Sequence, residues 1–395
     1  MVVIFRFLNT FLCAIFLSLL CNAACLAQDS DTTTQRSKDT HAIDEVTPTK
    51  AVENEAQRQI EESLDVPEED AAALDSGKVM STTKEKAAAS GESTFIGKDD
   101  STVNAKLAKT KKGKRPSVAL ALGGGGARGA AHIGVLRVLS EAGIKIDYIV
   151  GNSMGAIVGG LYAAGVPLDR IEAMILDGSL RKAYKPGMVP PAILLNPFEK
   201  LLHPFRKHYA GLWSGKKFGK FLEKQLPENV QNIEDTPIPF SAVATNLLDG
   251  KAYRISDGKL STAMRASSSI PGILQPVAIG DKVYVDGAVR ANMPASGARD
   301  TGADIVVAVL VDNPLKILPA IEFRSLSGIL GRMTDVMLAV ADARQLPFAD
   351  IIINPDVSGI GVVNGTREDA KRAILAGETA TRKALPEIKK RLLRH

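Results

Sequence analysis

Apolar positions follow two different periods along residues 116–395. Short apolar runs predict buried strands, and stretches that repeat an apolar residue every three or four positions predict helices. The expected strands are 117–122, 146–150, 239–246, 251–255, 282–285, 303–311 and 351–354. The expected helices are 127–142, 154–164, 258–268 and 367–394, the last a helix pair broken near Pro386. Strands that alternate with helices predict an α/β fold with a layered, mostly parallel central sheet flanked by helices.

Residues 1–27 have the pattern of a secretory signal peptide. Arg6 precedes a largely apolar run over 7–20, and small residues follow before Gln28. The run is shorter than the roughly 20 apolar residues that a membrane-spanning helix needs. We therefore expect cleavage after Ala27 and an exported protein that is periplasmic, outer-membrane-associated or secreted. An uncleaved anchor and lipid attachment at Cys25 stay open as alternatives.

Residues 28–115 are rich in Thr, Ser, Ala, Glu and Lys, and Phe95 is their only aromatic residue. Such a segment cannot bury enough apolar surface to offset the entropy of ordering, so we expect a disordered low-complexity linker. Its basic end, 109–115, is expected to be a solvated charge run or a contact with an anionic surface. The folded domain then covers 116–395, with a motif core at roughly 117–313.

Composition narrows the chemistry of the site. All three cysteines lie within residues 1–27, so the mature chain would have neither a disulfide nor thiolate metal ligands. The five histidines show no metal-ligand spacing, and a net charge of +5 gives no independent case for nucleic acid. We expect no metal, no cofactor and no nucleic-acid partner, and the sequence shows no obligatory protein partner.

Two glycine-rich turns lie about two dozen residues apart, each between an apolar run and a helical pattern. The first, 123–129, offers backbone N–H groups at a helix N-terminus, where negative charge is stabilised. The second, Gly151–Gly155, matches the G-x-S-x-G elbow, which holds a serine (here Ser153) on a strained strand-to-helix turn. An anion cradle beside an exposed serine favours acyl transfer. The first turn also fits a dinucleotide-binding loop, but Asp147 lies near the start of its strand rather than at the end.

The base for such a serine is not an obvious histidine. His132 lies just after the first glycine turn, on the predicted helix 127–142, where a hydrogen-bonded packing role is favoured. No histidine comes just after a late strand, where a Ser-Asp-His hydrolase would place it. Asp286 leaves a short strand and is followed by small residues, so it could accept the serine proton directly. Asp-Gly is also a common hairpin turn, and that interpretation stays open.

Several blocks, in this order, resemble the patatin-like phospholipase family in its bacterial, secreted form: GGGGARGAAHIGVL, GNSMG, ATNLLDGKAYRI, AMRASSSIPGILQP and YVDGAVRANMP. The resemblance implies a Ser-Asp dyad, with Ser153 as nucleophile and Asp286 as base. Gly151 and Gly155 are its elbow glycines. It also implies an oxyanion hole formed by Gly124, Gly125, Gly126, Arg128 and Gly129. Departures from the family pattern at Gly123, Asn246 and Ala288 leave the substrate preference open.

The expected activity is that of a serine acyl hydrolase that releases fatty acid from phospholipids or lysophospholipids. A general carboxylesterase or thioesterase, and a non-catalytic lipid-binding protein, stay open as alternatives. Segment 181–224 carries ten lysines and arginines against two glutamates, with aromatic residues interleaved. It is expected to be either a cap or membrane-contact element over the acyl pocket, or an ordinary insertion whose aromatic residues join the core.

Overall fold

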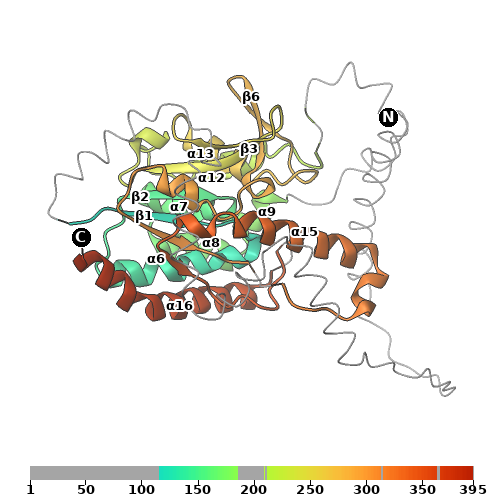
Figure 1. Ribbon diagram of the computed structural model, residues 1–395. Helices are drawn as coiled ribbons and strands as arrows, with labels where there is room; N and C mark the ends of the chain where they lie inside the picture. Colours follow the sequence, from blue (N-terminus) through green and yellow to red (C-terminus); the bar gives the residue numbers. More distant parts are fainter. Residues whose placement is uncertain (1–114, 186–208, 210, 313–314, 363–364, 395) are drawn as a thin grey trace. The chain divides into compact units, whose positions relative to one another are not determined.

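The computed structural model describes residues 115–185, 209, 211–312, 315–362 and 365–394 (Figure 1). These residues all belong to one compact unit, Glu92–His395. The expected signal peptide and almost all of the expected linker lie outside the described residues. Most of the first half of segment 181–224 lies outside them as well.

In the described residues the strands form one mixed sheet with the order β5-β6-β3-β2-β1-β7-β8, and β4 pairs with β3. Their bounds are β1 Val118–Leu122, β2 Tyr148–Asn152, β3 Phe240–Asn246, β4 Ala252–Ile255, β5 Val277–Ile279, β6 Lys282–Asp286, β7 Ile305–Val309 and β8 Ile351–Ile353. The run β3-β2-β1-β7-β8 is parallel, whereas β4 and β6 run antiparallel to β3. Every residue of β1, β2, β3 and β7 is buried, as expected for strands covered on both faces.

Helices cover both faces of this sheet (Figure 1). The α-helices are α6 Ala131–Glu141, α7 Met154–Ala163, α8 Leu168–Leu176, α9 Ser179–Tyr184, α12 Lys216–Glu223, α13 Leu260–Ser267, α14 Ala295–Arg299, α15 Leu326–Ala343 and α16 Arg367–Arg394. Successive residues of β1 point to opposite faces, so Leu120 joins the larger apolar core and Ala121 a smaller one against α14. The α/β architecture expected from the sequence is confirmed.

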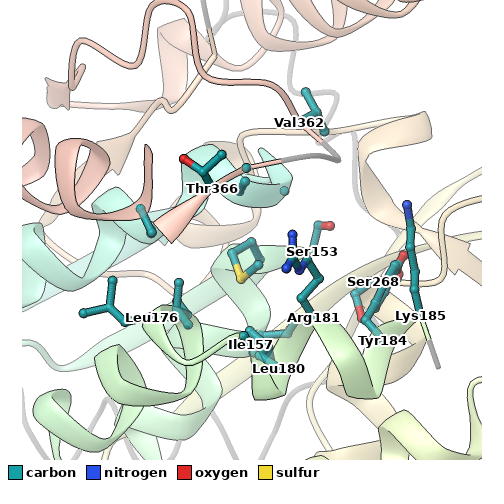
Figure 2. Close-up of a pocket in the computed structure, with 18 of the residues that line it drawn as sticks. Ser153, Ile157, Leu176, Leu180, Arg181, Tyr184, Lys185, Ser268, Val362 and Thr366 are labelled. Atoms are coloured by element: carbon teal, nitrogen blue, oxygen red, sulfur yellow. Dashed lines mark hydrogen bonds between the residues drawn. The ribbon is translucent and has the colours of Figure 1, made fainter. Parts of the chain in front are cut away.

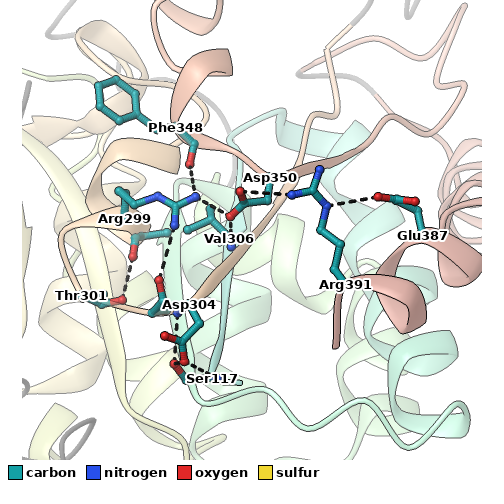
Figure 3. Close-up of polar contacts among 11 residues, drawn as sticks. Ser117, Arg299, Thr301, Asp304, Val306, Phe348, Asp350, Glu387 and Arg391 are labelled. Atoms are coloured by element: carbon teal, nitrogen blue, oxygen red, sulfur yellow. Dashed lines mark hydrogen bonds and ion pairs between the residues drawn. The ribbon is translucent and has the colours of Figure 1, made fainter. Parts of the chain in front are cut away.

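The predicted break near Pro386 is wrong, because α16 runs unbroken from Arg367 to Arg394 with Pro386 inside it. An internal proline costs a helix about 3 kcal/mol. Contacts beyond the proline offset that cost: Ile388 is fully buried, and Arg391 lies 3.6 Å from the carboxylate of Asp350. Figure 3 shows Asp350 between Arg391 and Arg299, at the amino end of β8. Tertiary packing therefore overrides the local helix-breaking signal.

Two further boundaries differ from the expectation. The helix expected at 127–142 begins with a 3-10 turn, η1 Gly126–Ala130, and becomes α-helical at Ala131. The strand expected at 146–150 lies two residues later, as β2 Tyr148–Asn152. Asp147 precedes that strand, and its carboxylate accepts a hydrogen bond from the Val118 N–H at 2.9 Å. The shift brings the end of β2 directly to Ser153.

Candidate active site

The pairing along β3 determines which strand ends meet. β2 pairs in parallel with the first half of β3, and its last residue, Asn152, lies opposite Val243. β6 runs antiparallel along the second half of the same edge, where Asp286 lies opposite Ala244. The other edge of β3 is taken by β4 over residues 242–245. The carboxyl ends of β2 and β6 therefore face each other, which brings Ser153 and Asp286 together.

Ser153 is held in a strained turn between β2 and α7. It has φ 51° and ψ −118°, and among the described non-glycine residues it alone has a positive φ. The two elbow glycines allow the chain to pack this tightly. A Cβ on Gly151 would lie 2.5 Å from the Gly155 carbonyl oxygen, and one on Gly155 would collide with the Leu122 carbonyl. The elbow predicted from the sequence is thus formed by these residues.

A second serine fixes the backbone of the elbow. The Ser153 N–H donates to Ser267 Oγ at 2.9 Å, and Ser267 Oγ donates to the Val243 carbonyl at 2.5 Å. Ser267 is the last residue of α13 and is fully buried. These two bonds tie the strained residue to β3. Ser267 lies in the family-like block AMRASSSIPGILQP, where its residue type alone predicted no role.

Ser153 and Asp286 form a direct hydrogen bond. Ser153 Oγ donates to Asp286 Oδ2 at 2.7 Å, and the Ala288 N–H donates to Asp286 Oδ1 at 2.9 Å. Burial raises the pKa of Asp286 to about 6, against the two hydrogen bonds, which lower it. A carboxylate with this pKa is a stronger base than an ordinary aspartate and is still ionised at neutral pH.

His132 takes no part in this pair. It is fully buried, its Nε2 lies 2.8 Å from the Gly123 carbonyl oxygen, and burial lowers its pKa to about 4. The imidazole is therefore neutral at pH 7 and supports the glycine loop from behind. The hydrogen-bonded packing role expected from the sequence is confirmed.

The glycine loop lies directly beside Ser153. The Gly124 N–H donates to the Asn292 carbonyl at 3.1 Å and is therefore occupied. Within the described residues, the N–H groups of Gly125 and Gly126 have no acceptor. Gly126 has φ 54°, and a Cβ there would collide with the Val362 carbonyl. Two backbone donors are thus left for an oxyanion.

The other two residues of the predicted oxyanion group support the loop. Arg128 is buried, and its Nε donates to the Ile360 carbonyl at 2.7 Å. Its guanidinium lies 3.5 Å from Asp312 and does not line the cavity described below. Gly129 packs against Met154, where a Cβ would lie 2.5 Å from the Met154 Cγ. Both residues therefore contribute by holding the loop against its neighbours.

A buried polar network that was not predicted from the sequence lies behind the loop. The Asn292 carbonyl accepts from the Gly124 N–H and from Asn152 Nδ2, at 3.1 and 3.0 Å. Its Nδ2 donates to Asp312 at 2.5 Å and to Asp342 at 3.1 Å. Burial raises the pKa of Asp312 to about 8, so the two neighbouring carboxyls retain a proton at neutral pH. One asparagine thus connects the loop, the elbow and an acid pair.

Only part of this network has a sequence signal. Asn292 lies in the block YVDGAVRANMP, six residues after Asp286, so its position relative to the base could have been noted. Asp312 follows β7 and Asp342 lies near the end of α15, with no local pattern that distinguishes either residue. Their convergence on Asn292 depends on the tertiary fold.

Ser153 opens into a cavity of about 210 Å³ with mainly apolar walls (Figure 2). Apolar side chains in the wall include Met154, Ile157, Leu176, Leu180 and Phe218. Arg181, Lys185 and Arg367 also line it. An apolar cavity with a few polar groups at one place suits the acyl chain of an ester.

The described part of segment 181–224 contains both aromatic side chains that pack in the core and lysines on a helix. Tyr184 and Phe218 pack edge-to-face with ring centroids 5.1 Å apart, and both line the cavity. Lys216, Lys217 and Lys220 lie on α12, whose Phe218 is buried. The two aromatic residues therefore belong to the core beside the cavity, and membrane contact by the lysines stays a prediction.

Other candidate sites receive little support. Asp147, the acid that a dinucleotide-binding loop would need, lies at the amino end of β2 and pairs with Arg115 at 2.6 Å. In the described residues, no group of three or more His, Cys, Asp or Glu is placed to hold a metal ion. No helix in that part of the chain combines the length and apolar character needed to cross a membrane.

Residues 120–299 match the family model described as patatin-like phospholipase. This part of the chain belongs to the patatin-like phospholipase family. An uncharacterized NTE family protein of Mycobacterium tuberculosis is 36% identical over 197 residues, 49% of either chain. A second NTE family protein of that species, also uncharacterized, is 31% identical over 291 residues, 68% of this chain and 46% of the other. VipD from Legionella pneumophila aligns with a TM-score of 0.39 and 16% identity, over 70% of this chain and 67% of VipD.

The family resemblance drawn from the sequence blocks is thereby confirmed, while its secreted form stays a prediction. The chain spans about half the length of these curated relatives. Within the patatin-like region lie the glycine loop, the elbow serine, Asp286 and Asn292, so the site described above is contained in the matched residues.

Proposed function

We propose that this protein is a serine acyl hydrolase that uses a Ser-Asp dyad to release fatty acid from phospholipids or lysophospholipids. The observation that carries the proposal is the 2.7 Å hydrogen bond from Ser153 Oγ to Asp286, placed where Ser153 enters an apolar cavity. The patatin-like phospholipase match supports a lipid ester as the substrate.

The first half of the reaction forms an acyl-enzyme. Asp286 Oδ2 accepts the Ser153 proton while Oγ attacks the acyl carbonyl, which becomes a tetrahedral oxyanion. The free N–H groups of Gly125 and Gly126 stabilise this oxygen, together with the N-terminus of the following helix. The oxyanion then collapses, the bond to the leaving alcohol breaks, and Asp286 returns the proton to that alcohol.

The second half regenerates the enzyme. A water molecule gives its proton to Asp286 and attacks the acyl carbon, and a second oxyanion forms at the same donors. Its collapse releases the fatty acid while the proton returns to Ser153 Oγ. Because one carboxylate takes and returns every proton, its pKa of about 6 suits both directions better than an ordinary aspartate would.

We also propose that the chain is exported and acts at a membrane surface. Support comes from the leader-like pattern at 1–27 and the basic, aromatic-rich segment 181–224. Amino-terminal sequencing of the mature protein distinguishes cleavage after Ala27 from lipid attachment at Cys25. A retained Met1 would contradict both forms of processing.

The decisive experiment measures fatty-acid release from a panel of phospholipids and lysophospholipids by the full chain, with Ser153→Ala as the matched control. Release that depends on Ser153 is expected. Labelling of Ser153 by a fluorophosphonate without lipid release would favour a carboxylesterase or thioesterase, which short acyl esters and acyl thioesters would then detect. Neither release nor labelling would leave a non-catalytic lipid-binding protein.

A further inference from the structure

Three cationic residues line the same cavity as the nucleophile: Arg181 and Lys185 come from one short stretch of the chain, and Arg367 begins α16. Arg181 lies in α9 and Lys185 directly follows that helix. In Figure 2 the Arg181 side chain extends from its helix toward Ser153, and Lys185 lies beside Tyr184. Most other residues of the wall are apolar, and Arg181 and Lys185 lie close enough for the charge of Arg181 to act on Lys185.

No carboxylate in the described residues forms an ion pair with Arg181 or Lys185. Asp177 also lines the cavity, but the positive charge that acts on its carboxylate is that of Lys182. Arg137, a partly buried arginine elsewhere in the described structure, contacts Glu172 and Glu378, whereas Arg181 is exposed. The two cations are therefore available to an anion that enters the cavity.

The two cations also repel one another. Lys185 is half-buried, and both its burial and the charge of Arg181 lower its pKa. Holding like charges together beside an apolar cavity is unfavourable until an anion lies between them. Arginine offers a planar pair of donors that matches phosphate oxygens, and lysine adds a compact positive charge.

We propose that Arg181 and Lys185 form a subsite for the phosphate group of the lipid substrate. This inference rests on the proposed function and makes it more specific. An acyl chain in the apolar cavity places its ester at Ser153, and in a phospholipid the same glycerol carries the phosphate, on a carbon one or two positions from the acylated carbon. The subsite then selects phosphate-bearing acylglycerols over neutral acylglycerols of equal chain length.

The test compares two ether lipids that Ser153 cannot cleave, an alkyl lysophosphatidylcholine and the matching alkylglycerol without phosphate. Both are titrated into the full-length protein by calorimetry below their micelle concentrations. The wild type is expected to bind the phosphate lipid more tightly. In Arg181→Gln, Lys185→Gln and the double variant, this preference falls, roughly tenfold to a hundredfold in the double variant. Lys182→Gln is the matched control, because this exposed residue of the same helix does not line the cavity.

Equal affinity of the wild type for the two lipids would overturn the proposal. So would a double variant that loses affinity for both lipids to the same extent, since that result indicates a damaged cavity. Fatty-acid release from ester lipids is measured in parallel. Absence of release with an intact phosphate preference would refute the proposed hydrolysis and leave the subsite standing. Release without a phosphate preference would support the proposed hydrolysis and refute the subsite.

Discussion

The two edges of the parallel sheet bury carboxylates in opposite ways. At the amino edge an aspartate directly precedes each of β2, β7 and β8: Asp147, Asp304 and Asp350. Each accepts a hydrogen bond from a backbone N–H at the start of the neighbouring strand, respectively from Val118, Ser117 and Val306. Asp147 and Asp350 also form ion pairs with arginines (Figure 3 shows Asp350). At this edge the charge is compensated.

At the carboxyl edge the compensation is missing where chemistry is proposed. Asp286 accepts hydrogen bonds from Ser153 and the Ala288 N–H, and no cation of the described residues pairs with it. A salt-bridged carboxylate is a weak base, because the cation favours its charged form. A buried carboxylate without a cation binds a proton more readily. Carboxylates are buried at both edges, so burial alone does not make a carboxylate a base. The groups that pair with the carboxylate decide whether it can accept a proton.

Substitution at both edges tests this comparison most strongly. Asp286→Asn and Ser153→Ala are expected to lower kcat roughly 10⁴-fold or more, because the base or the nucleophile is lost. Asp147→Asn at the amino edge should leave kcat near the wild-type value. Turnover of a chromogenic ester, with circular dichroism as the folding control, measures all three. Substantial activity of Asp286→Asn would refute the dyad.

Substitutions at two glycines, each in close contact with its neighbours, distinguish an effect on the geometry of the site from an effect on packing. A Cβ on Gly124 would lie 2.5 Å from Asn292 Oδ1 and 2.9 Å from Asn152 Nδ2, whereas one on Gly134 would collide with the Ile374 carbonyl of α16. Gly124→Ala is expected to displace the oxyanion loop and lower kcat about 10²- to 10³-fold. Gly134→Ala should instead lower the free energy of unfolding and leave kcat of the folded fraction near normal.

Steady-state kinetics and thermal unfolding of both glycine variants distinguish these outcomes. If Gly134→Ala lowers kcat as much as Gly124→Ala while both proteins stay folded, the loop has no special role in the rate. A substrate with a better leaving group is not expected to restore the kcat of Gly124→Ala, because the oxyanion forms with every ester.

The pH dependence of the rate should reflect the carboxyl edge alone. Asp286 must be ionised to accept the Ser153 proton, so kcat/KM is expected to fall about tenfold per pH unit below its pKa of about 6. Arg128, Asn292 and Asp335 surround the Asp312–Asp342 pair. Above pH 8 this pair loses its shared proton. The added negative charge then weakens the support that the pair gives to the glycine loop. The profile should therefore be bell-shaped.

Asp312→Asn provides the control for the alkaline limb. The amide keeps a hydrogen-bonding group at this position without the second charge, so the decline above pH 8 should disappear while the acid limb stays. An alkaline limb that persists unchanged in Asp312→Asn would show that the acid pair does not support the loop.

The smallest expected effect concerns stability. The pKa of Asp286 is raised on folding, so the folded state binds more protons than the unfolded state between about pH 4 and pH 6. Stability therefore falls as the pH rises through this range and stays lower above it. Asp286→Asn should be more stable than the wild type at pH 8, by about 3 kcal/mol at most, and should lose this advantage at pH 4. Asp147→Asn should be less stable at pH 7.

Thermal unfolding at the two pH values measures this difference. A wild type and an Asp286→Asn variant with equal unfolding temperatures at pH 8 would show that the Asp286 charge is compensated in the folded protein after all. That result would remove the contrast between the edges.

The sequence by itself determined the α/β class, most strands, and the two short segments that carry the elbow and the base. These features are local: an apolar run forms a buried strand, and glycines that leave no room for a Cβ define the turn around Ser153. The family blocks added the pairing of Ser153 with Asp286, which are 133 residues apart. The cavity at Ser153 and the expected leader had weaker signals, and both the acyl chain in the cavity and the leader stay predictions.

Only the tertiary structure decided the features that depend on distant neighbours. The register of β3 sets the strand ends opposite each other, and burial at that point sets the pKa of Asp286. Asp312 and Asp342 reach Asn292 from separate elements, and α16 passes Pro386 because Ile388 and Arg391 find partners beyond it. Periodicity and turn chemistry act within a few residues of the chain, whereas burial, charge and packing depend on what the folded chain brings alongside.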